Sequence, residues 1–150
     1  MPRQWVQLAW RSRSIFRDWE SLLRKPEQSV ATDPTGWERR ILSPVLPGVE
    51  FELMRTTIPP GVDAGDFAPH APGSREYLAM ERGTLQLTID GTPYTLHAGD
   101  SIYYAGDCWH GFANRGRVTC AYYLAMELAQ HGAGRARPRR RAREVTRRRS

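Results

Sequence analysis

GTLQLTIDGTPYTLHAGD, residues 83–100, is the stretch that decides the fold. In it, two runs of alternating apolar and polar residues flank Asp90-Gly91, a dipeptide that suits a type I′ turn with both central residues at positive φ. The pattern therefore predicts a β-hairpin. Because a hairpin brings its flanking segments together, residues far apart in the sequence, such as Glu76 and His110, can share one site.

Short runs of β-type residues surround this hairpin, with turn signals at about the 8 to 12-residue spacing of sandwiches and barrels. The predicted strands span residues 37–42, 51–58, 77–80, 85–89, 94–97, 101–104, 111–113 and 118–126. Long helical patterns do not alternate with these strands, which argues against a parallel α/β fold. The sequence thus predicts an all-β sandwich or barrel.

Both ends of the chain differ from this centre. Residues 5–23 place apolar side chains at helical spacing and predict an amphipathic helix that ends near Pro26. We favour packing of this helix on its own domain over a dimerisation or membrane-surface role. The predicted organisation is an N-terminal amphipathic helix and linker at 1–30, the β domain at 31–130, and an Arg-rich disordered tail at 131–150.

The net charge of +6 hides an uneven distribution. Residues 1–25 carry +4 and residues 131–150 carry +8, whereas residues 26–130 carry −6. The acidic centre therefore gives no sign of a nucleic-acid groove. Nucleic acid is a conceivable partner only through the tail, whose arginines can neutralise phosphates. We favour a solvated extension, because no aromatic residues are interleaved to stack on bases.

Length and composition narrow the class of protein further. A chain of 150 residues is long enough for one domain with a real core. No apolar run approaches the roughly 20 residues of a membrane span, and the N-terminus offers no continuous apolar signal-peptide core. Cys108 and Cys120 make a poor disulfide framework. We expect a soluble, cytoplasmic protein that does not associate with membranes.

Alternation of side chains in a strand tests the proposed site. If Glu76 points inward, so do Leu78 and Met80, and the face that carries the carboxylate is otherwise apolar. An unpaired buried charge is very costly, so the carboxylate needs a partner. His110, another cation or a metal ion could serve.

Two segments carry a resemblance to the cupin superfamily, small β-barrels of the jelly-roll type. In PGVDAGDFAPHAPGSREYLAMERG, residues 60–83, His70, Glu76 and Gly83 match the first cupin motif at the family spacing, while Pro72 stands where the motif has a second histidine.

In GDSIYYAGDCWHGFAN, residues 99–114, Gly99, His110 and Asn114 match the second motif, while Ala105 and Asp107 replace its Pro and Gly. The resemblance implies an all-β jelly-roll cupin β-barrel. The amino-acid sequences of both segments are most similar to the C-terminal sensor cupin of bacterial helix-turn-helix transcription regulators. The chain departs from those proteins, because residues 1–30 are too few for their multi-helix DNA-binding domain.

The resemblance leaves His70, Glu76 and His110 for chemistry. Two histidines and one carboxylate are the ligand set of many non-haem iron sites, and they also suit Mn, Ni or Zn. One interpretation is therefore a single divalent metal cofactor. The other is a hydrogen-bonded His–Glu pair that lines a ligand pocket, and the ligand missing at Pro72 favours it.

Two functions compete on these grounds. In the first, the barrel is a sensor-like module that binds a small molecule, in a pocket lined by Leu78, Met80, Leu87, Tyr104, Phe112, Asn114 and Tyr122. In the second, it is a metal-dependent dioxygenase or isomerase that uses His70, Glu76 and His110. An enzyme would need a base or a substrate-orienting cation, and no Arg or Lys falls on the faces of Glu76 and His110. We therefore favour binding.

Three smaller expectations complete the prediction. Edge strands of small sandwiches need covering, so we expect a homodimer. His97 is expected at a strand end in solvent. Cys108 is expected to be a small buried hydrophobe rather than a nucleophile.

Overall fold

The computed structural model describes residues 21–129. The predicted tail and residues 5–20 of the predicted N-terminal helix lie outside this range. The last residues of that helix, 21–23, are described and are not helical. A short 3₁₀ helix, η1 (Lys25–Glu27), follows them. Within the described residues, no helix has the length and apolar character needed to cross a membrane.

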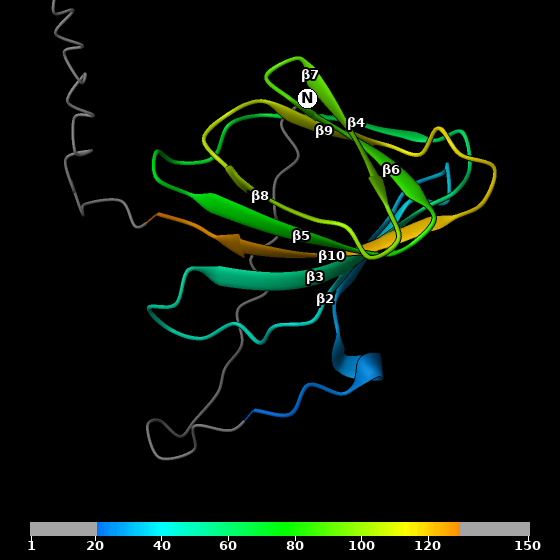
Figure 1. Ribbon diagram of the computed structural model, residues 1–150. Helices are drawn as coiled ribbons and strands as arrows, with labels where there is room; N and C mark the ends of the chain where they lie inside the picture. The colour runs from blue at the N-terminus through cyan, green and yellow to red at the C-terminus, as the bar shows by residue number, and fades with distance from the viewer. Residues whose placement is uncertain (1–20, 130–150) are drawn as a thin grey trace, which may run out of the picture.

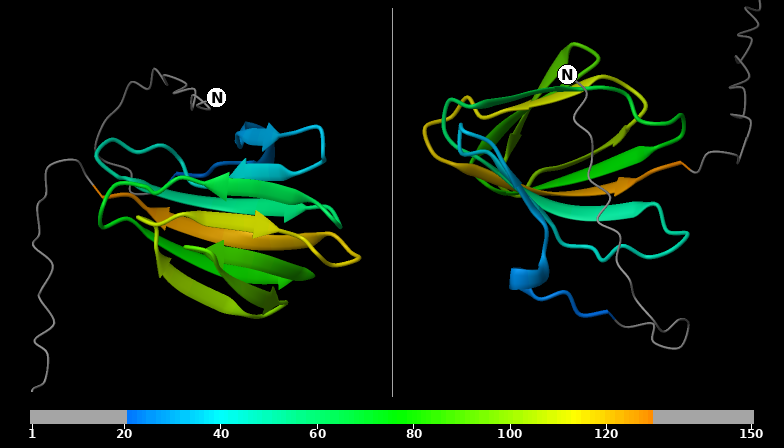
Figure 2. Two further views of the ribbon diagram at one scale, coloured as in Figure 1. Left: turned by 90° about the horizontal axis from the view of Figure 1, so that it is seen from above. Right: turned by 180° about the vertical axis from the view of Figure 1, so that it is seen from behind.

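Two antiparallel sheets face one another and form the body of the molecule (Figure 1). The six-stranded sheet has the order β1 (Val30–Thr32), β2 (Glu38–Ile41), β3 (Phe51–Ile58), β10 (Cys120–Glu127), β5 (Arg75–Arg82), β8 (Ser101–Ala105). The four-stranded sheet has the order β4 (Asp63–Phe67), β9 (His110–Ala113), β6 (Thr84–Ile89), β7 (Thr92–His97). Figure 2 shows the same two layers from above and from behind.

The prediction of a nearly all-β domain is confirmed, and each of the eight predicted strands has a counterpart. Two described strands were missed. β1 lies in a stretch that reads as linker, and β4 (DAGDF) has a weakly β-forming composition. β4 has a register shift in its pairing with β9, so its strand character comes from its partner. Among residues 21–129, hydrogen-bonded pairing does not join the two sheets into a closed barrel.

The predicted hairpin is confirmed. β6 and β7 pair from Thr84↔His97 to Ile89↔Thr92. The two residues between them have positive φ, +45° at Asp90 and +79° at Gly91, as a primed two-residue turn requires. The aliphatic side chains that share one face of β6 are buried or half-buried, because that face packs against the opposite sheet.

One hydrophobic core fills the space between the sheets. Its buried members come from both layers, namely Trp37, Met54, Ile58, Leu78, Met80, Leu85, Leu87, Leu96, Tyr104, Phe112, Cys120, Tyr122 and Leu124. Full burial of one such side chain contributes about 1.5–3 kcal/mol to folding. The packing of these residues therefore holds the sheets together and fixes what points into the space between them.

Strand register carries inward-facing side chains across the six-stranded sheet in rows. One row runs from Arg39 through Thr56 and Tyr122 to Met80, each residue opposite the next on the neighbouring strand. All four side chains are buried. This row places a cation, a hydroxyl and a phenol side by side in the interior.

Gly83 lies very close to the start of β10. Its φ is +74°, which disfavours L side chains, and an added Cβ would lie 2.8 Å from the Cα of Cys120. Backbone, not a movable side chain, blocks the position. This glycine, which matches the end of the first motif, is therefore required by packing.

Candidate metal and ligand site

The structure brings the three predicted donors together. His70 lies in the segment between β4 and β5, Glu76 is the second residue of β5, and His110 is the first residue of β9. One donor atom from each lies within 4.8 Å of the others. The site therefore spans both sheets and joins two segments that are distant in the sequence.

A single carboxylate oxygen stands between the two imidazoles. Glu76 Oε1 lies 3.1 Å from His70 Nε2 and 3.3 Å from His110 Nε2. The Glu76 and His110 side chains are only 1% and 2% exposed, whereas that of His70 is 30% exposed. The cluster is thus closed at its base and accessible from the side of His70.

The second ring nitrogen of His110 fixes the tautomer of the imidazole. Nδ1 lies 2.9 Å from the carbonyl oxygen of Cys108. A carbonyl can only accept, so Nδ1 carries a proton and donates it. In the neutral ring, Nε2 then holds a lone pair that faces Glu76 Oε1. Two lone-pair atoms at this distance need a proton or a metal cation between them.

The other oxygen of Glu76 accepts a hydrogen bond from the Tyr104 hydroxyl. Burial alone would raise the pKa of Glu76, but His70, His110 and Tyr104 oppose it, and the pKa ends below its usual value. Burial and the neighbouring Glu76 raise the pKa of Tyr104. A carboxylate that is held ionised by a neutral phenol is a suitable anionic ligand for a cation.

Glu76 Oε1 itself is buried, and among the described residues the two imidazole nitrogens lie near it without making a hydrogen bond of good geometry. A buried oxygen anion without a donor is costly. Ligands about 2.1 Å from a metal at right angles lie roughly 3.0 Å apart, close to the two His–Glu separations observed. The donor set and its spacing thus fit a divalent metal ion.

The backbone at Gly106 packs closely against the cluster. His70 N donates to Gly106 O at 2.9 Å, and Gly106 N donates to Ser74 O at 2.9 Å. A Cβ added to Gly106 would lie 3.4 Å from the His70 ring and 3.5 Å from Glu76 Oε1. The sequence analysis missed Gly106, although a glycine four residues before a candidate ligand is a visible signal.

The predicted pocket residues lie in the core around this cluster. Leu78, Met80, Leu87, Tyr104, Phe112 and Tyr122 are all buried. The ring of Phe112 stacks on that of Tyr122 at 5.6 Å and meets His110 edge-on at 5.7 Å. The rings of Phe112 and Tyr122 form an apolar wall beside the candidate metal ligand His110.

Asn114 is buried but has a different role. Its Nδ2 donates to the carbonyls of Ile58 and Val118 at 2.9 and 2.8 Å, and its Oδ1 accepts from Gly116 N at 2.9 Å. These bonds tie three backbone segments together. We therefore assign this side chain to holding the end of β9 rather than to contacting a ligand.

Arg39 was missed by the sequence analysis. It comes from β2, is only 5% exposed, and its guanidinium carbon lies 5.3 Å from the centre of the Phe67 ring. Phe67 in turn stacks against His110 at 5.9 Å. The strands of Glu76 and His110 do lack an inward cation, as expected, but β2 supplies one. Alternation from the buried Trp37 would have placed Arg39 inward.

Two smaller expectations are settled by position. His97 ends β7 and is exposed, as predicted. Cys108 is half-buried rather than buried, and its Sγ donates to the Ala105 carbonyl at 2.9 Å. Burial, with Asp90 and Asp107 nearby, raises the pKa of this thiol, which argues against a nucleophile.

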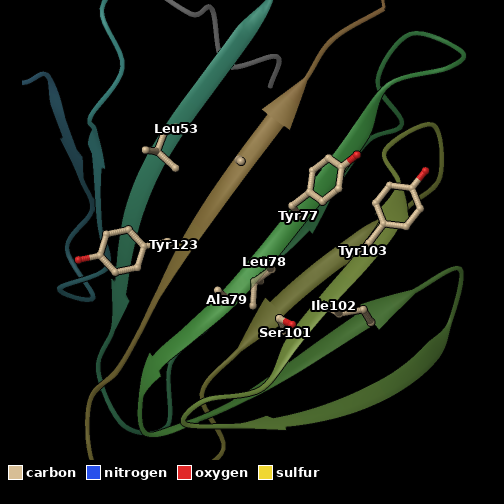
Figure 3. Close-up of a pocket in the computed structure, with 9 residues that line it drawn as sticks. Leu53, Tyr77, Leu78, Ala79, Ser101, Ile102, Tyr103 and Tyr123 are labelled. Atoms are coloured by element: carbon tan, nitrogen blue, oxygen red, sulfur yellow. The ribbon is translucent and has the colours of Figure 1, made fainter.

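A shallow groove of about 350 Å³ lies away from the cluster, on the outer face of the six-stranded sheet (Figure 3). Tyr77 and Tyr103 are paired across β5 and β8 with ring centres 4.8 Å apart, and Tyr123 projects from β10 on the same face. The three rings are 39–56% exposed. This aromatic face is open to solvent and separate from the His–Glu–His cluster.

The structure thus consists of two facing antiparallel sheets with a two-histidine, one-carboxylate cluster as a candidate metal site. Residues 54–126 match the family model described as the cupin domain, and this part of the chain is a cupin domain. Its sequence is similar to part of a transcription regulator, and its fold is similar to the cupin domain of another.

The individual relatives agree with this assignment. Over 82 residues the chain is 29% identical to the HTH-type transcriptional regulator SutR of Escherichia coli, an alignment that covers 55% of this chain and 46% of that protein. The chain thus spans about half the length of the curated relative it matches.

Two solved structures share the fold. The cupin domain of an XRE family transcriptional regulator from Enterobacter cloacae superposes with a TM-score of 0.59 at 22% identity, covering 63% of this chain and 98% of that one. A predicted oxalate decarboxylase from Thermotoga maritima gives 0.56 at 17% identity, covering 73% and 100%.

Proposed function

We propose that this cupin domain is a sensor-like module that binds a small molecule between its sheets, beside a divalent metal held by His70, Glu76 and His110. One observation carries the metal proposal. The unpaired Oε1 of Glu76 faces a lone pair of His110, in a cluster that is closed below and accessible beside His70. One cation bound between them would interact favourably with both Glu76 Oε1 and the lone pair of His110 Nε2.

The residues have distinct roles in this proposal. His70 and His110 are neutral nitrogen ligands, Glu76 is the anionic ligand, and Tyr104 holds the carboxylate in orientation through its hydroxyl hydrogen bond. Two nitrogens and one oxygen suit Fe, Mn, Ni or Zn. When bound, such a metal would act as a Lewis acid that can coordinate an oxygen atom of a small-molecule ligand.

A sensor role is supported by the relatives rather than by the site. SutR is named a transcriptional regulator, and the Enterobacter structure is the cupin domain of one. In a regulator, a ligand that stabilises the cupin domain can change the conformation or the binding affinity of another domain or chain. We place the protein in the cytoplasm on the same grounds.

A metal-dependent enzyme is a second candidate, and Arg39 favours it. The sequence analysis preferred binding because no inward cation was expected, and the structure supplies one from β2. An arginine can orient an anionic substrate beside a metal. A relative of the fold is a predicted oxalate decarboxylase. Single-turnover assays of the metal-loaded protein with small organic acids under oxygen, and without it, separate catalysis from binding.

Metal analysis of the purified full chain tests the proposed site. We expect close to one equivalent of Fe, Mn, Ni or Zn, its removal by a chelator, and its return on reloading. His110→Ala should lose the metal. His97→Ala is the matched control, because that histidine is exposed at the end of β7 and should leave the metal content unchanged. Trace metal in the wild type, with no change in His110→Ala after reloading, would rule out the metal site.

We also propose that the protein forms a homodimer through the aromatic face of the six-stranded sheet, with a second copy of this chain as the partner. A symmetric pair would bring Tyr77, Tyr103 and Tyr123 of each copy against the same face of the other. Exposed aromatic groups gathered on one sheet face are characteristic of interaction surfaces.

A further inference from the structure

Arg39 is a buried cation that has no ion-pair partner in the described part of the chain. It lies in the middle of β2 and is 5% exposed. The ion pairs formed by residues 21–129 do not include it. Burial of an unpaired charge destabilises a folded protein, so a buried arginine needs a reason.

The contacts of Arg39 satisfy only part of its guanidinium. Nε donates to Thr56 Oγ1 at 3.3 Å. The guanidinium carbon lies 5.2 Å from the Trp37 ring and 5.3 Å from the Phe67 ring, which gives cation–π attraction on its flat sides. Nη2, however, is buried and has no hydrogen-bond partner among the described residues. One edge of the fork therefore remains free to donate.

A second unpaired group comes from the same row. The Tyr122 hydroxyl is buried and also lacks a partner within residues 21–129. Register sets Arg39 opposite Thr56, and Thr56 opposite Tyr122. Burial raises the pKa of Tyr122 to about 12, even though the charge of Arg39 and polar contacts of the hydroxyl with Thr56 and Arg39 lower it, so the phenol keeps its proton near neutral pH. Two donors and one positive charge thus share the inner face of three neighbouring strands.

We propose that Arg39 and Tyr122 form an anion subsite between the sheets that takes the carboxylate of a small organic acid. A carboxylate supplies the negative charge that Arg39 has no partner for among the described residues. Its oxygens can accept hydrogen bonds from both Arg39 Nη2 and the Tyr122 hydroxyl. The proposal rests on the proposed function in one respect, since it names the ligand class of that same interior site.

Phe67 connects this subsite to the metal cluster. Its ring contacts the Arg39 guanidinium and stacks on His110. The rings of Phe67 and Phe112 thus form a continuous series of contacts between Arg39 and His110. Arg39 lies upstream of the matched cupin segment, 54–126, so the anion subsite depends on a strand that the family match does not include.

Calorimetric titration of the full chain with sodium acetate, oxalate and succinate tests the subsite, with sodium chloride at equal ionic strength as the inorganic anion. We expect at least one acid to bind the wild type and chloride not to displace it. Arg39→Gln should weaken that binding at least about tenfold, the loss expected for one charge-assisted pair. Tyr122→Phe should weaken it less.

Arg40→Gln is the matched control, because Arg40 is the next residue of β2 and pairs with Glu38 instead. It should bind the acid like the wild type. Arg39→Lys keeps the charge but lacks the planar fork, so it should bind with intermediate affinity, and it serves if Arg39→Gln fails to fold by circular dichroism. No binding of any of the three acids to the wild type would overturn the proposal. So would equal binding by Arg39→Gln, or equal binding of chloride.

Metal content separates this test from that of the metal site. Arg39→Gln should keep its metal while it loses the acid, which isolates the anion subsite. His110→Ala should lose the metal while it keeps residual acid binding through Arg39. A wild type that binds an acid without any metal would sustain the anion subsite and reject the metal proposal.

Discussion

His110 presents Nε2 to Glu76 Oε1 at 3.3 Å because Nδ1, on the other side of the ring, is held by the carbonyl of Cys108 at 2.9 Å. The backbone of the segment before β9 thus sets the tautomer that a metal ligand needs. The same ring stacks on Phe67 and touches Phe112, so its plane is fixed as well. Because neighbouring groups hold the His110 side chain in place, substitutions of those neighbours should also affect metal binding.

Tyr104→Phe should weaken the metal site without removing a ligand. The change deletes the hydroxyl that donates to Glu76 Oε2 and leaves a buried carboxylate oxygen without that donor. We expect metal affinity to fall about 10 to 100-fold and the free energy of unfolding of the metal-free protein to fall by about 1–3 kcal/mol. Competition with a chromophoric chelator measures the first, and urea denaturation the second.

Tyr103→Phe is the control for that variant, because Tyr103 is the preceding residue of β8 and its ring is exposed on the outer face. It should change neither quantity. If the two phenylalanine variants hold metal equally well, the Tyr104 hydroxyl has no part in orienting Glu76.

Glu76 should make the stability of the metal-free protein depend on acid pH. Its pKa in the folded state is lowered, so its carboxylate contributes stability that is complete above the unfolded pKa of about 4.3. That contribution is lost as the pH falls through the folded-state pKa. Glu76→Gln has no such titration. Urea unfolding of both proteins at several pH values should show a stability difference that shrinks toward low pH, and a constant difference would contradict the assignment.

Gly83→Ala should destabilise the protein more than Gly91→Ala. Both glycines have positive φ, so both substitutions carry the strain of that conformation, about 1–2 kcal/mol. Only at Gly83 does the new Cβ also meet the Cα of Cys120, at 2.8 Å, whereas nothing lies within 4 Å at Gly91. The difference between the two melting temperatures measures the close approach. Equal losses would mean that β5 and β10 separate there at no cost.

Asn114→Ala should lower the free energy of unfolding by about 3 kcal/mol, because buried backbone groups of three segments lose their partner. Asn114→Asp keeps Oδ1 for Gly116 but loses both donors, and it should recover little of the stability. Ligand binding per folded molecule should be unchanged in both variants. A variant that folds normally but loses ligand would place Asn114 in the pocket after all.

Tyr103→Glu should convert the proposed homodimer to a monomer. The change puts a charge on the aromatic face between β5 and β8, where a second copy would have to bury it. Light scattering at micromolar concentration gives the mass. Tyr94→Glu, on an exposed ring of β7 in the other sheet, should leave the dimer intact. A wild type that already scatters as a monomer would refute the dimer.

The sequence by itself determined the fold class and the three donors of the cluster. Alternation along the strand places Glu76, Leu78 and Met80 on one face. Separately, the Asp90-Gly91 turn fixes the register of the hairpin. The motif spacing then paired Glu76 with His70 and His110. The inferences on strands and turns are local, since each needs only a few neighbouring residues, whereas the link between Glu76 and His110 came from the resemblance to the two cupin motifs.

Only the tertiary structure decided what the interior contains. Arg39 lies far from both motifs in sequence, and its place beside Thr56, Tyr122 and Phe67 depends on the pairing of β2 with β3 and the packing of one sheet on the other. The hydrogen bond from His110 to the Cys108 carbonyl and the approach of Gly106 to Glu76 likewise depend on loop conformations. Short-range patterns set the period of a strand, but long-range packing sets which strands meet and which charges share the space between them.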